Sequence, residues 1–218
     1  MTDAQRQRLL ERLNPHTPNA ADWQHPHVEL ELGMGDGLAL LERAKATPNR
    51  LFIGCEVYLN GVQVALNNLE RTPLPNVRLT NTDARELLDS LPAGCLERVL
   101  IPFPDPWPKA KHHKRRLVQA PLLDTCARAL QDGGELWVIT DWPPYAYHSM
   151  AVLFGHDGFT LEGCGLEAAA CKPSARLEER LGPRHLATAP TWWIETKYQA
   201  KAASASRETW YINAVKKS

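Results

Sequence analysis

Three glycines and an acid stand close together near the start of the chain. The segment reads Glu31-Leu-Gly-Met-Gly-Asp-Gly37, so glycine occupies positions Gly33, Gly35 and Gly37. Glycine lets a backbone turn sharply and pass close to a ligand. The dinucleotide-binding fingerprint has G-x-G-x-x-G spacing, whereas this segment has G-x-G-x-G with an acid two residues before the first glycine. This form suits a ligand without a pyrophosphate, such as S-adenosylmethionine, a cation whose amino-acid tail favours a nearby carboxylate.

Two further acids follow at spacings that fit the same ligand. Glu56 lies within Ile53-Gly-Cys-Glu-Val57, 19 residues past Gly37, where an acid can accept hydrogen bonds from ribose hydroxyls. Asp83 lies within Asn81-Thr-Asp-Ala84, where an acid can meet an adenine amino group. Taken singly, Asp83 can equally be a helix cap and Glu31 a solvated strand residue. The ordered set favours a cofactor site.

A proline-rich loop carries the next candidate. Four prolines occur within seven residues of Pro102-Phe-Pro-Asp-Pro-Trp-Pro-Lys109, which fixes the backbone and lowers the entropic cost of holding one conformation. We expect Asp105, between two prolines, to project from a rigid loop. Trp107 offers a flat face on which a nucleic-acid base could stack. The alternative is a plain structural turn with a buried tryptophan.

A basic run begins where this loop ends. It has five cations, two histidines and no acid, and the rest of the chain then carries 20 cations and 25 anions, a net charge of −5. Such a patch can bind phosphates although the whole chain is neutral. The alternative is the solvated start of a helix. Its cations are Lys109, Lys111, Lys114, Arg115 and Arg116.

The surrounding pattern alternates strands with helices. An N-terminal helix capped at Thr2 or Asp3 precedes a connector over 14–27. The strands are expected at 28–32, 51–57, 77–80, 98–101, 134–140 and 209–215, and the helices at 38–46, 61–70, 84–91, 117–130 and 145–154. This order predicts an α/β fold, a parallel sheet with helices on both faces.

Ligands bind such sheets at the carboxyl ends of the strands, and the candidate acids all stand there. Asp141, within Thr140-Asp-Trp-Pro-Pro-Tyr145, stands at such an end too. Asp141 could orient a substrate or hold the basic loop.

Composition narrows the remaining possibilities. Hydrophobic residues make up 44% of the 218 residues, enough for a core, and the longest apolar runs are far too short to cross a bilayer. The charged N-terminus lacks the apolar segment of a signal peptide, so we expect a cytoplasmic protein without membrane contact. Five scattered cysteines without a C-x-x-C pair argue against disulfides and a zinc site, and no metal is expected.

The central motifs resemble those of the bacterial tRNA (guanine-N(7)-)-methyltransferase family. The resemblance rests on F-P-D-P-W-P-K-x-K-H-H-K-R-R-L-V-Q and I-T-D-W-x-x-Y-A, runs from about residue 28 to 150, and resumes at Thr196-Lys-Tyr-Gln199. It implies the class I methyltransferase (Rossmann-like) sheet, seven-stranded and mostly parallel with one antiparallel strand, for which 209–215 is the candidate. It also implies S-adenosylmethionine as cofactor and methyl transfer to N(7) of a guanine in the variable loop of tRNA.

The same resemblance assigns roles to residues. Asp105 would be the catalytic aspartate, and Glu31, Glu56, Asp83 and Asp105 would contact S-adenosylmethionine or its surroundings. The tRNA would be bound by Lys109, Asp141, Thr196, Lys197, Tyr198 and Gln199. The chain departs from the family at Gln199, where glutamate is usual, at Pro102, and over 171–193, which matches poorly.

We expect one methyltransferase domain over 1–218, as a monomer or homodimer. Residues 1–27 would form a helix and connector, 28–165 the catalytic core, and 166–218 a substrate-binding part. Alternative functions are methylation of another RNA base or an amine, or an inactive RNA-binding homologue. A nicotinamide oxidoreductase is disfavoured by the glycine spacing.

Overall fold

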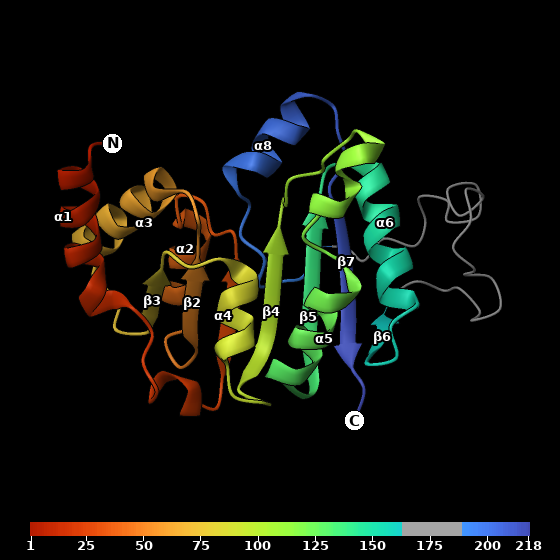
Figure 1. Cartoon of the computed structure of the whole chain (residues 1–218), viewed down its shortest axis with the longest axis horizontal. Coiled ribbons are helices and arrows are strands. Elements are labelled where there is room, and N and C mark those ends of the chain that lie inside the picture. The colour runs from red at the N-terminus through yellow and green to blue at the C-terminus, as the bar shows by residue number, and fades with distance from the viewer. Residues whose placement is uncertain (163–188) are drawn as a thin grey trace.

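The computed structural model describes residues 1–162 and 189–218, which form a seven-stranded sheet flanked by helices (Figure 1). The strand order is β3-β2-β1-β4-β5-β7-β6. The strands are β1 (Val28–Leu32), β2 (Leu51–Cys55), β3 (Val77–Thr80), β4 (Leu96–Pro102), β5 (Leu130–Thr140), β6 (Phe159–Glu162) and β7 (Trp210–Lys216).

The pairing confirms the predicted fold class. β1 to β5 pair in parallel, and β7 runs antiparallel to both β5 and β6. The carboxyl ends of the parallel strands therefore meet at one edge, the upper edge in Figure 1. The reversed strand is the C-terminal one, as the family resemblance implies.

Helices pack on both faces of the sheet. One core joins α4 (Ala84–Ser90), α5 (Ala120–Ala129) and α6 (Pro143–Phe154) to β1, β4 and β5. A second joins α1 (Asp3–Leu13), α2 (Leu38–Ala46) and α3 (Leu59–Arg71) to β2 and β3. The remaining helix, α8 (Lys197–Ser204), lies above the carboxyl ends of the strands (Figure 1). Short 3₁₀ helices occupy Asn14–His16, Asp22–Gln24 and Ala110–Arg115.

Local chemistry explains where the elements begin. Thr2 caps α1 through a capping box with Gln5, which fixes the predicted helix start. β5 begins at Leu130, four residues earlier than expected, because Leu96 and Leu130 pair beyond an irregularity in the β4–β5 ladder. α5 begins at Ala120, three residues later than expected. The backbone of Val118 instead donates to the Tyr145 hydroxyl at 3.2 Å.

Among the strands and α-helices that the structure describes, β6 and α8 are absent from the sequence prediction. The irregular stretch expected at 171–191 lies mostly outside the described residues. Among the helices that the structure describes, none has the length and apolar character needed to span a membrane.

Candidate functional site

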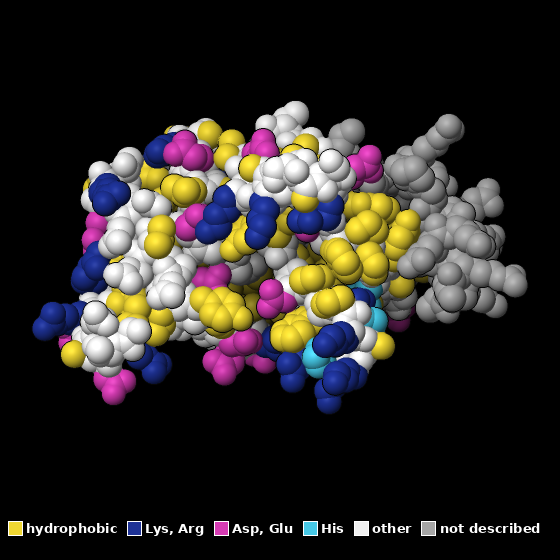
Figure 2. Space-filling view, turned by 90° about the horizontal axis from the view of Figure 1, so that it is seen from above, with side chains coloured by type: hydrophobic (Ala, Val, Ile, Leu, Met, Phe, Trp, Pro, Cys, Tyr) yellow, Lys and Arg dark blue, Asp and Glu magenta, His cyan; other side chains and the backbone are white. Residues whose placement is uncertain are grey.

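A cavity of about 300 Å³ opens at the carboxyl edge of the sheet. It brings together predicted residues from five separate segments of the chain. These are Gly33 and Gly35, Glu56, Asp83, Asp105 with Trp107 and Arg115, and Tyr198. Figure 2 looks down on this edge of the molecule.

The glycine turn forms one wall of this main cavity. Gly33, Gly35 and Gly37 have φ angles of +82°, +58° and +71°, in the left-handed region that side chains disfavour. A Cβ at Gly37 would also lie 2.8 Å from the Cβ of Ala65 on α3. The glycines are therefore needed for the turn itself, which brings bare backbone to the cavity.

Glu56 and Asp83 also line the main cavity, and they follow the ends of β2 and β3. The Glu56 carboxylate accepts hydrogen bonds from the backbone of Gly35 at 3.0 Å and of Tyr58 at 2.9 Å, so it also fastens the glycine turn. Asp83 caps α4 by accepting from the backbone of Arg85 at 2.8 Å. The helix-cap interpretation of Asp83 is thus correct, and the same side chain faces the cavity.

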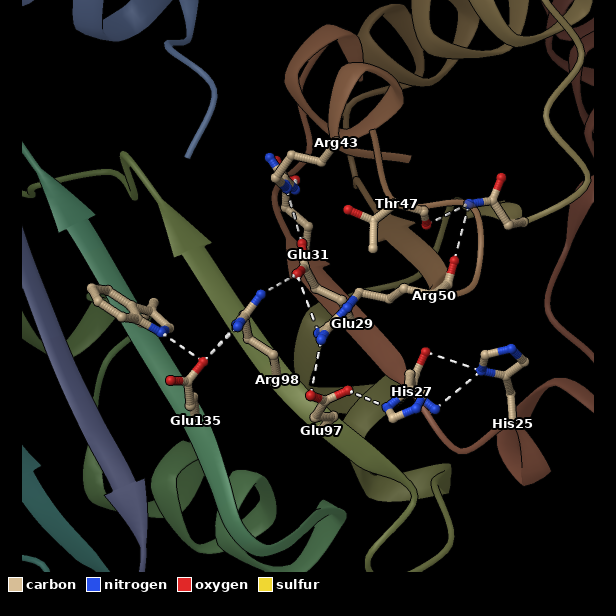
Figure 3. A network of polar contacts seen from close by, with 12 residues as sticks. His25, His27, Glu29, Glu31, Arg43, Thr47, Arg50, Glu97, Arg98 and Glu135 are labelled. Atoms are coloured by element: carbon tan, nitrogen blue, oxygen red, sulfur yellow. Dashed lines mark hydrogen bonds and ion pairs between the residues drawn. The ribbon is translucent and has the colours of Figure 1, made fainter. Parts of the chain in front are cut away.

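Glu31 is not the solvated strand residue that the alternating sequence allowed. Its side chain is only 3% exposed and forms an ion pair with Arg43 of α2 (Figure 3). Arg43 also donates to Glu29 at 2.9 Å, and Glu29 pairs with Arg98 of β4 at 2.9 Å. Burial raises the pKa of Glu31, and the Arg43 charge opposes that shift. The polar face of β1 is therefore covered by α2 and carries a buried charge network.

A smaller cavity of about 100 Å³ adjoins the main one. It places Glu31 and Gly33 of β1 and the glycine turn beside Thr196 and Lys197 at the start of α8. Glu31 contributes to this smaller cavity, whereas Glu56 and Asp83 line the larger one. All of the predicted cofactor residues except Gly37 thus border two adjacent cavities that share Gly33.

The proline-rich loop holds Asp105 in an unusual backbone setting. Phe103 and Trp107, two residues before and after it, have φ angles of +47° and +43°, which are rare for residues with side chains. Such conformations persist where the surroundings enforce them, and they cluster at functional sites. The Phe103 ring stacks on Tyr198 at 6.1 Å, and Trp107 lies 5.0 Å from the Arg115 guanidinium. Asp105 itself is exposed.

The basic run divides into exposed cations and one buried arginine. Lys109, Lys111, Lys114 and Arg115 are exposed, and lysine, arginine and histidine side chains gather together on one part of the surface in Figure 2. Arg116 is only 3% exposed, and its guanidinium donates to the carbonyl of Pro106 at 3.1 Å. Burial lowers the pKa of Arg116. This geometry does not favour the expected phosphate contact of Arg116, which instead fastens the basic run to the proline loop.

The Thr196–Gln199 segment starts α8. Thr196 caps the helix by accepting from the backbone of Gln199 at 3.1 Å. Lys197 forms a 2.8 Å ion pair with Asp36 of the glycine turn. Gln199 accepts from the Trp193 indole at 2.7 Å and donates to the Tyr211 hydroxyl at 2.7 Å, which ties α8 to β7.

A third cavity, of about 230 Å³, lies on the other side of the proline loop. Asp105 and Tyr198 line both this third cavity and the main one, and Asp141 lines the third. Asp141 forms an ion pair with Arg207 at 2.7 Å. The partner of this ion pair is therefore Arg207 and not a cation of the basic run. Sequence reasoning missed three residues here, Trp142, Lys201 and Arg207. Lys201 lies one helical turn beyond Lys197. Had a helix been predicted over 197–204, this spacing would have indicated Lys201 as a second cation beside the site.

Among the described residues, no three histidine, cysteine, aspartate or glutamate side chains gather as a metal site would require. The described cysteines are free thiols, and burial raises the pKa of Cys55 and of Cys126 to about 12. These two thiols are therefore protonated at neutral pH and suit the apolar core. Cys164 and Cys171 lie outside the described residues.

Comparison with known proteins agrees with this arrangement. The family model described as "Putative methyltransferase" matches residues 25–180, more than half of the chain. A tRNA (guanine-N(7)-)-methyltransferase of Rhodospirillum rubrum is 37% identical over 93% of this chain and 72% of its own. One of the same name from Marinobacter nauticus is 44% identical over 61% of this chain and 56% of its own.

A solved structure shares the fold at much lower sequence similarity. The 16S rRNA (adenine(1408)-N(1))-methyltransferase of Catenulisporales acidiphilia has a TM-score of 0.55 at 14% identity, covering 91% of this chain and 89% of its own. That likeness supports the methyltransferase sheet alone. The sequence matches go further, and they show that this chain belongs to the bacterial tRNA (guanine-N(7)-)-methyltransferase family.

Proposed function

We propose that this protein transfers a methyl group from S-adenosylmethionine to N(7) of a guanine in the variable loop of tRNA. The observation that carries the proposal is the position of Asp105. It stands on a constrained loop between the main cavity, lined by the glycine turn and two acids, and the third cavity, lined by aromatic and cationic side chains. One carboxylate can thus face both a cofactor and a base.

The main cavity fits S-adenosylmethionine in chemistry and size. Its volume is at the lower end of the range for small-ligand sites. Glu56 would accept from ribose hydroxyls, Asp83 would meet the adenine amino group, and the bare backbone at Gly33 and Gly35 would allow close approach. Val57 and Tyr58, 50% and 67% exposed, provide apolar surface for the adenine ring.

When bound, S-adenosylmethionine supplies a methyl group on a positively charged sulfur. Guanine N(7) carries a lone pair and no proton, so its attack requires no general base. The main catalytic need is therefore alignment of the two reactants. The Asp105 carboxylate would accept hydrogen bonds from the guanine N–H edge and stabilise the ring as it becomes cationic. We assign Asp105 to orientation and electrostatics, not to proton abstraction.

The third cavity would receive the guanine. Tyr198 and Trp142, 47% and 36% exposed, offer faces on which a base can stack. Lys201 and Arg207 place positive charge at the same cavity. The exposed lysines of the basic run would grip the phosphates nearby, so tRNA affinity should fall steeply with salt.

The test is methyl transfer from labelled S-adenosylmethionine to two tRNA transcripts, one with the variable-loop guanine and one with adenine there. We expect label on the first only, released by chemistry that cleaves at 7-methylguanosine. Equal labelling of both transcripts would contradict the assigned target. Absence of label on both, with cofactor binding intact, would contradict the assigned substrate and leave the cofactor site standing.

A further inference from the structure

The small cavity beside the glycine turn has an unusual balance of charge. It shares Gly33, Pro102, Phe103 and Tyr198 with the main cavity, so the two form neighbouring parts of one site. Three carboxylates and one ammonium line it. They belong to Glu31, Asp36, Glu195 and Lys197.

The acid at the base of this cavity is held rigidly. Arg43 binds the Oε2 atom of the Glu31 carboxylate, and the Glu31 side chain is 3% exposed. Arg43 is itself fixed by Glu29 at 2.9 Å (Figure 3). Because both partners come from regular elements, β1 and α2, the Glu31 carboxylate cannot move far to suit a ligand.

The cation on the other side is held loosely. The Lys197 ammonium pairs with Asp36 at 2.8 Å, but the Lys197 side chain is 53% exposed. The hydrogen bond to Asp36 raises the pKa of Lys197, which keeps the group charged. The Asp36 side chain is 20% exposed, so the pair reaches solvent mainly through the lysine. Ion pairs open to solvent have a small net stability, so a ligand anion can draw the ammonium away at little cost.

We infer that Lys197 is a cofactor-binding residue: its ammonium binds the carboxylate of the amino-acid tail of S-adenosylmethionine, and Glu31 faces the ammonium of that tail. A fixed acid and a movable cation across a hollow of about 100 Å³ match a zwitterion, which carries both charges on one carbon. The inference rests on the proposed function for the identity of the cofactor. It moves Lys197 from the tRNA contacts, where the family resemblance had placed it, to the cofactor.

This assignment gives successive turns of α8 separate tasks. Lys197 reaches the glycine turn, whereas Lys201, one helical turn later, lines the third cavity. Tyr198 lines all three cavities and stands between these tasks. The hydrogen bonds of Gln199 to Trp193 and Tyr211 hold the helix in place between them.

The test compares two ligands that differ in the tail. S-adenosylhomocysteine carries the whole amino-acid group, and 5′-methylthioadenosine lacks it. Binding of each ligand to the full chain is measured by calorimetry without tRNA, for the native protein and for Lys197→Met. Methionine keeps a long unbranched side chain and removes the ammonium. We expect the Kd of S-adenosylhomocysteine to rise about tenfold or more, since a charge-assisted hydrogen bond is lost. The Kd of 5′-methylthioadenosine should stay within twofold, which also shows that the variant is folded.

Lys201→Met is the matched control, with the same substitution on the same helix. It should leave the Kd of S-adenosylhomocysteine unchanged and weaken tRNA binding. An unchanged Kd for S-adenosylhomocysteine in Lys197→Met, with weaker tRNA binding, would overturn the inference. Equal weakening of both adenosine ligands would overturn it too, because the tail would then not be what Lys197 recognises. A protein that shows the expected tail dependence but does not methylate tRNA would contradict the proposed function alone.

Discussion

The cofactor side and the substrate side of the site are built in different ways. The cofactor side comes from one stretch, residues 28–83, in which three successive strands end beside one another. Its acids are held by internal partners, Glu31 by Arg43 and Glu56 by the backbone of Gly35. The substrate side gathers residues 103–116 and 140–142 together with Tyr198, Lys201 and Arg207, and most of its charged groups are exposed.

The difference follows from what each side would bind. A small ligand of fixed shape is bound best by groups already in place, because little ordering is then required on binding. A polyanion is attracted by exposed cations, whose contribution comes from displaced counterions. Buried, partnered acids beside a glycine turn and exposed lysines on the basic run are the arrangements that these two requirements favour.

The strongest test of the rigid side is Arg43→Met. It leaves Glu29 and Glu31 buried without their shared partner, and removal of one member of a buried ion pair costs about 3–5 kcal/mol. The free energy of unfolding, from urea titration at neutral pH, should fall by that amount. The loss should shrink as the pH is lowered, because burial already raises the pKa of Glu31 and its protonation removes an uncompensated charge.

Arg12→Met is the control for Arg43→Met. Its ion pair with Glu70, at 2.5 Å, is 41% and 39% exposed, so its removal should cost no more than about 1 kcal/mol. Equal losses of unfolding free energy in the two variants would mean that the buried network of Arg43, Glu29 and Glu31 contributes no more to stability than a surface ion pair.

Asp105→Asn tests the boundary between the two sides. The amide keeps the size of the side chain but loses the charge that would stabilise a cationic guanine, so kcat should fall about 100-fold or more. The Kd of S-adenosylhomocysteine should change less than threefold. Asp83→Asn should show the reverse pattern, with a higher Kd for S-adenosylhomocysteine and a smaller change in kcat. Near-normal turnover in Asp105→Asn would remove Asp105 from the mechanism.

The basic run offers a comparison within eight residues. Lys114→Met should lower the slope of log Kd for tRNA against log salt by about one, since it removes one exposed phosphate contact. Arg116→Met should instead reduce stability by about 1–2 kcal/mol, because its buried guanidinium bonds to Pro106. Filter binding over a salt series and urea unfolding separate the two effects. A full salt-slope change in Arg116→Met with normal stability would restore it as a phosphate contact.

Sequence reasoning succeeded where chemistry is local and failed where distant segments meet. The glycine turn, Asp83 as a cap and the proline loop depend on neighbouring residues, and each lies where predicted. The burial of Glu31 depends on α2 covering β1, which the alternation of V-E-L-E-L cannot reveal. The pairing of Asp141 with Arg207 joins residues 66 apart, which only the assembled fold brings together.

Gln199→Glu should have the smallest effect, although it restores the residue usual in the family. Gln199 now accepts from the Trp193 indole and donates to the Tyr211 hydroxyl, both at 2.7 Å. A glutamate can accept from both, because the tyrosine hydroxyl can rotate and become the donor. The network should therefore survive, and the free energy of unfolding should change by less than about 1 kcal/mol. Burial already raises the pKa of Tyr211 above its usual value, and a carboxylate at position 199 should raise it further. Ultraviolet titration of the tyrosines measures this shift. A large gain in kcat for Gln199→Glu would instead mean that this side chain reaches the substrate, and that α8 belongs more to the substrate side than its contacts indicate.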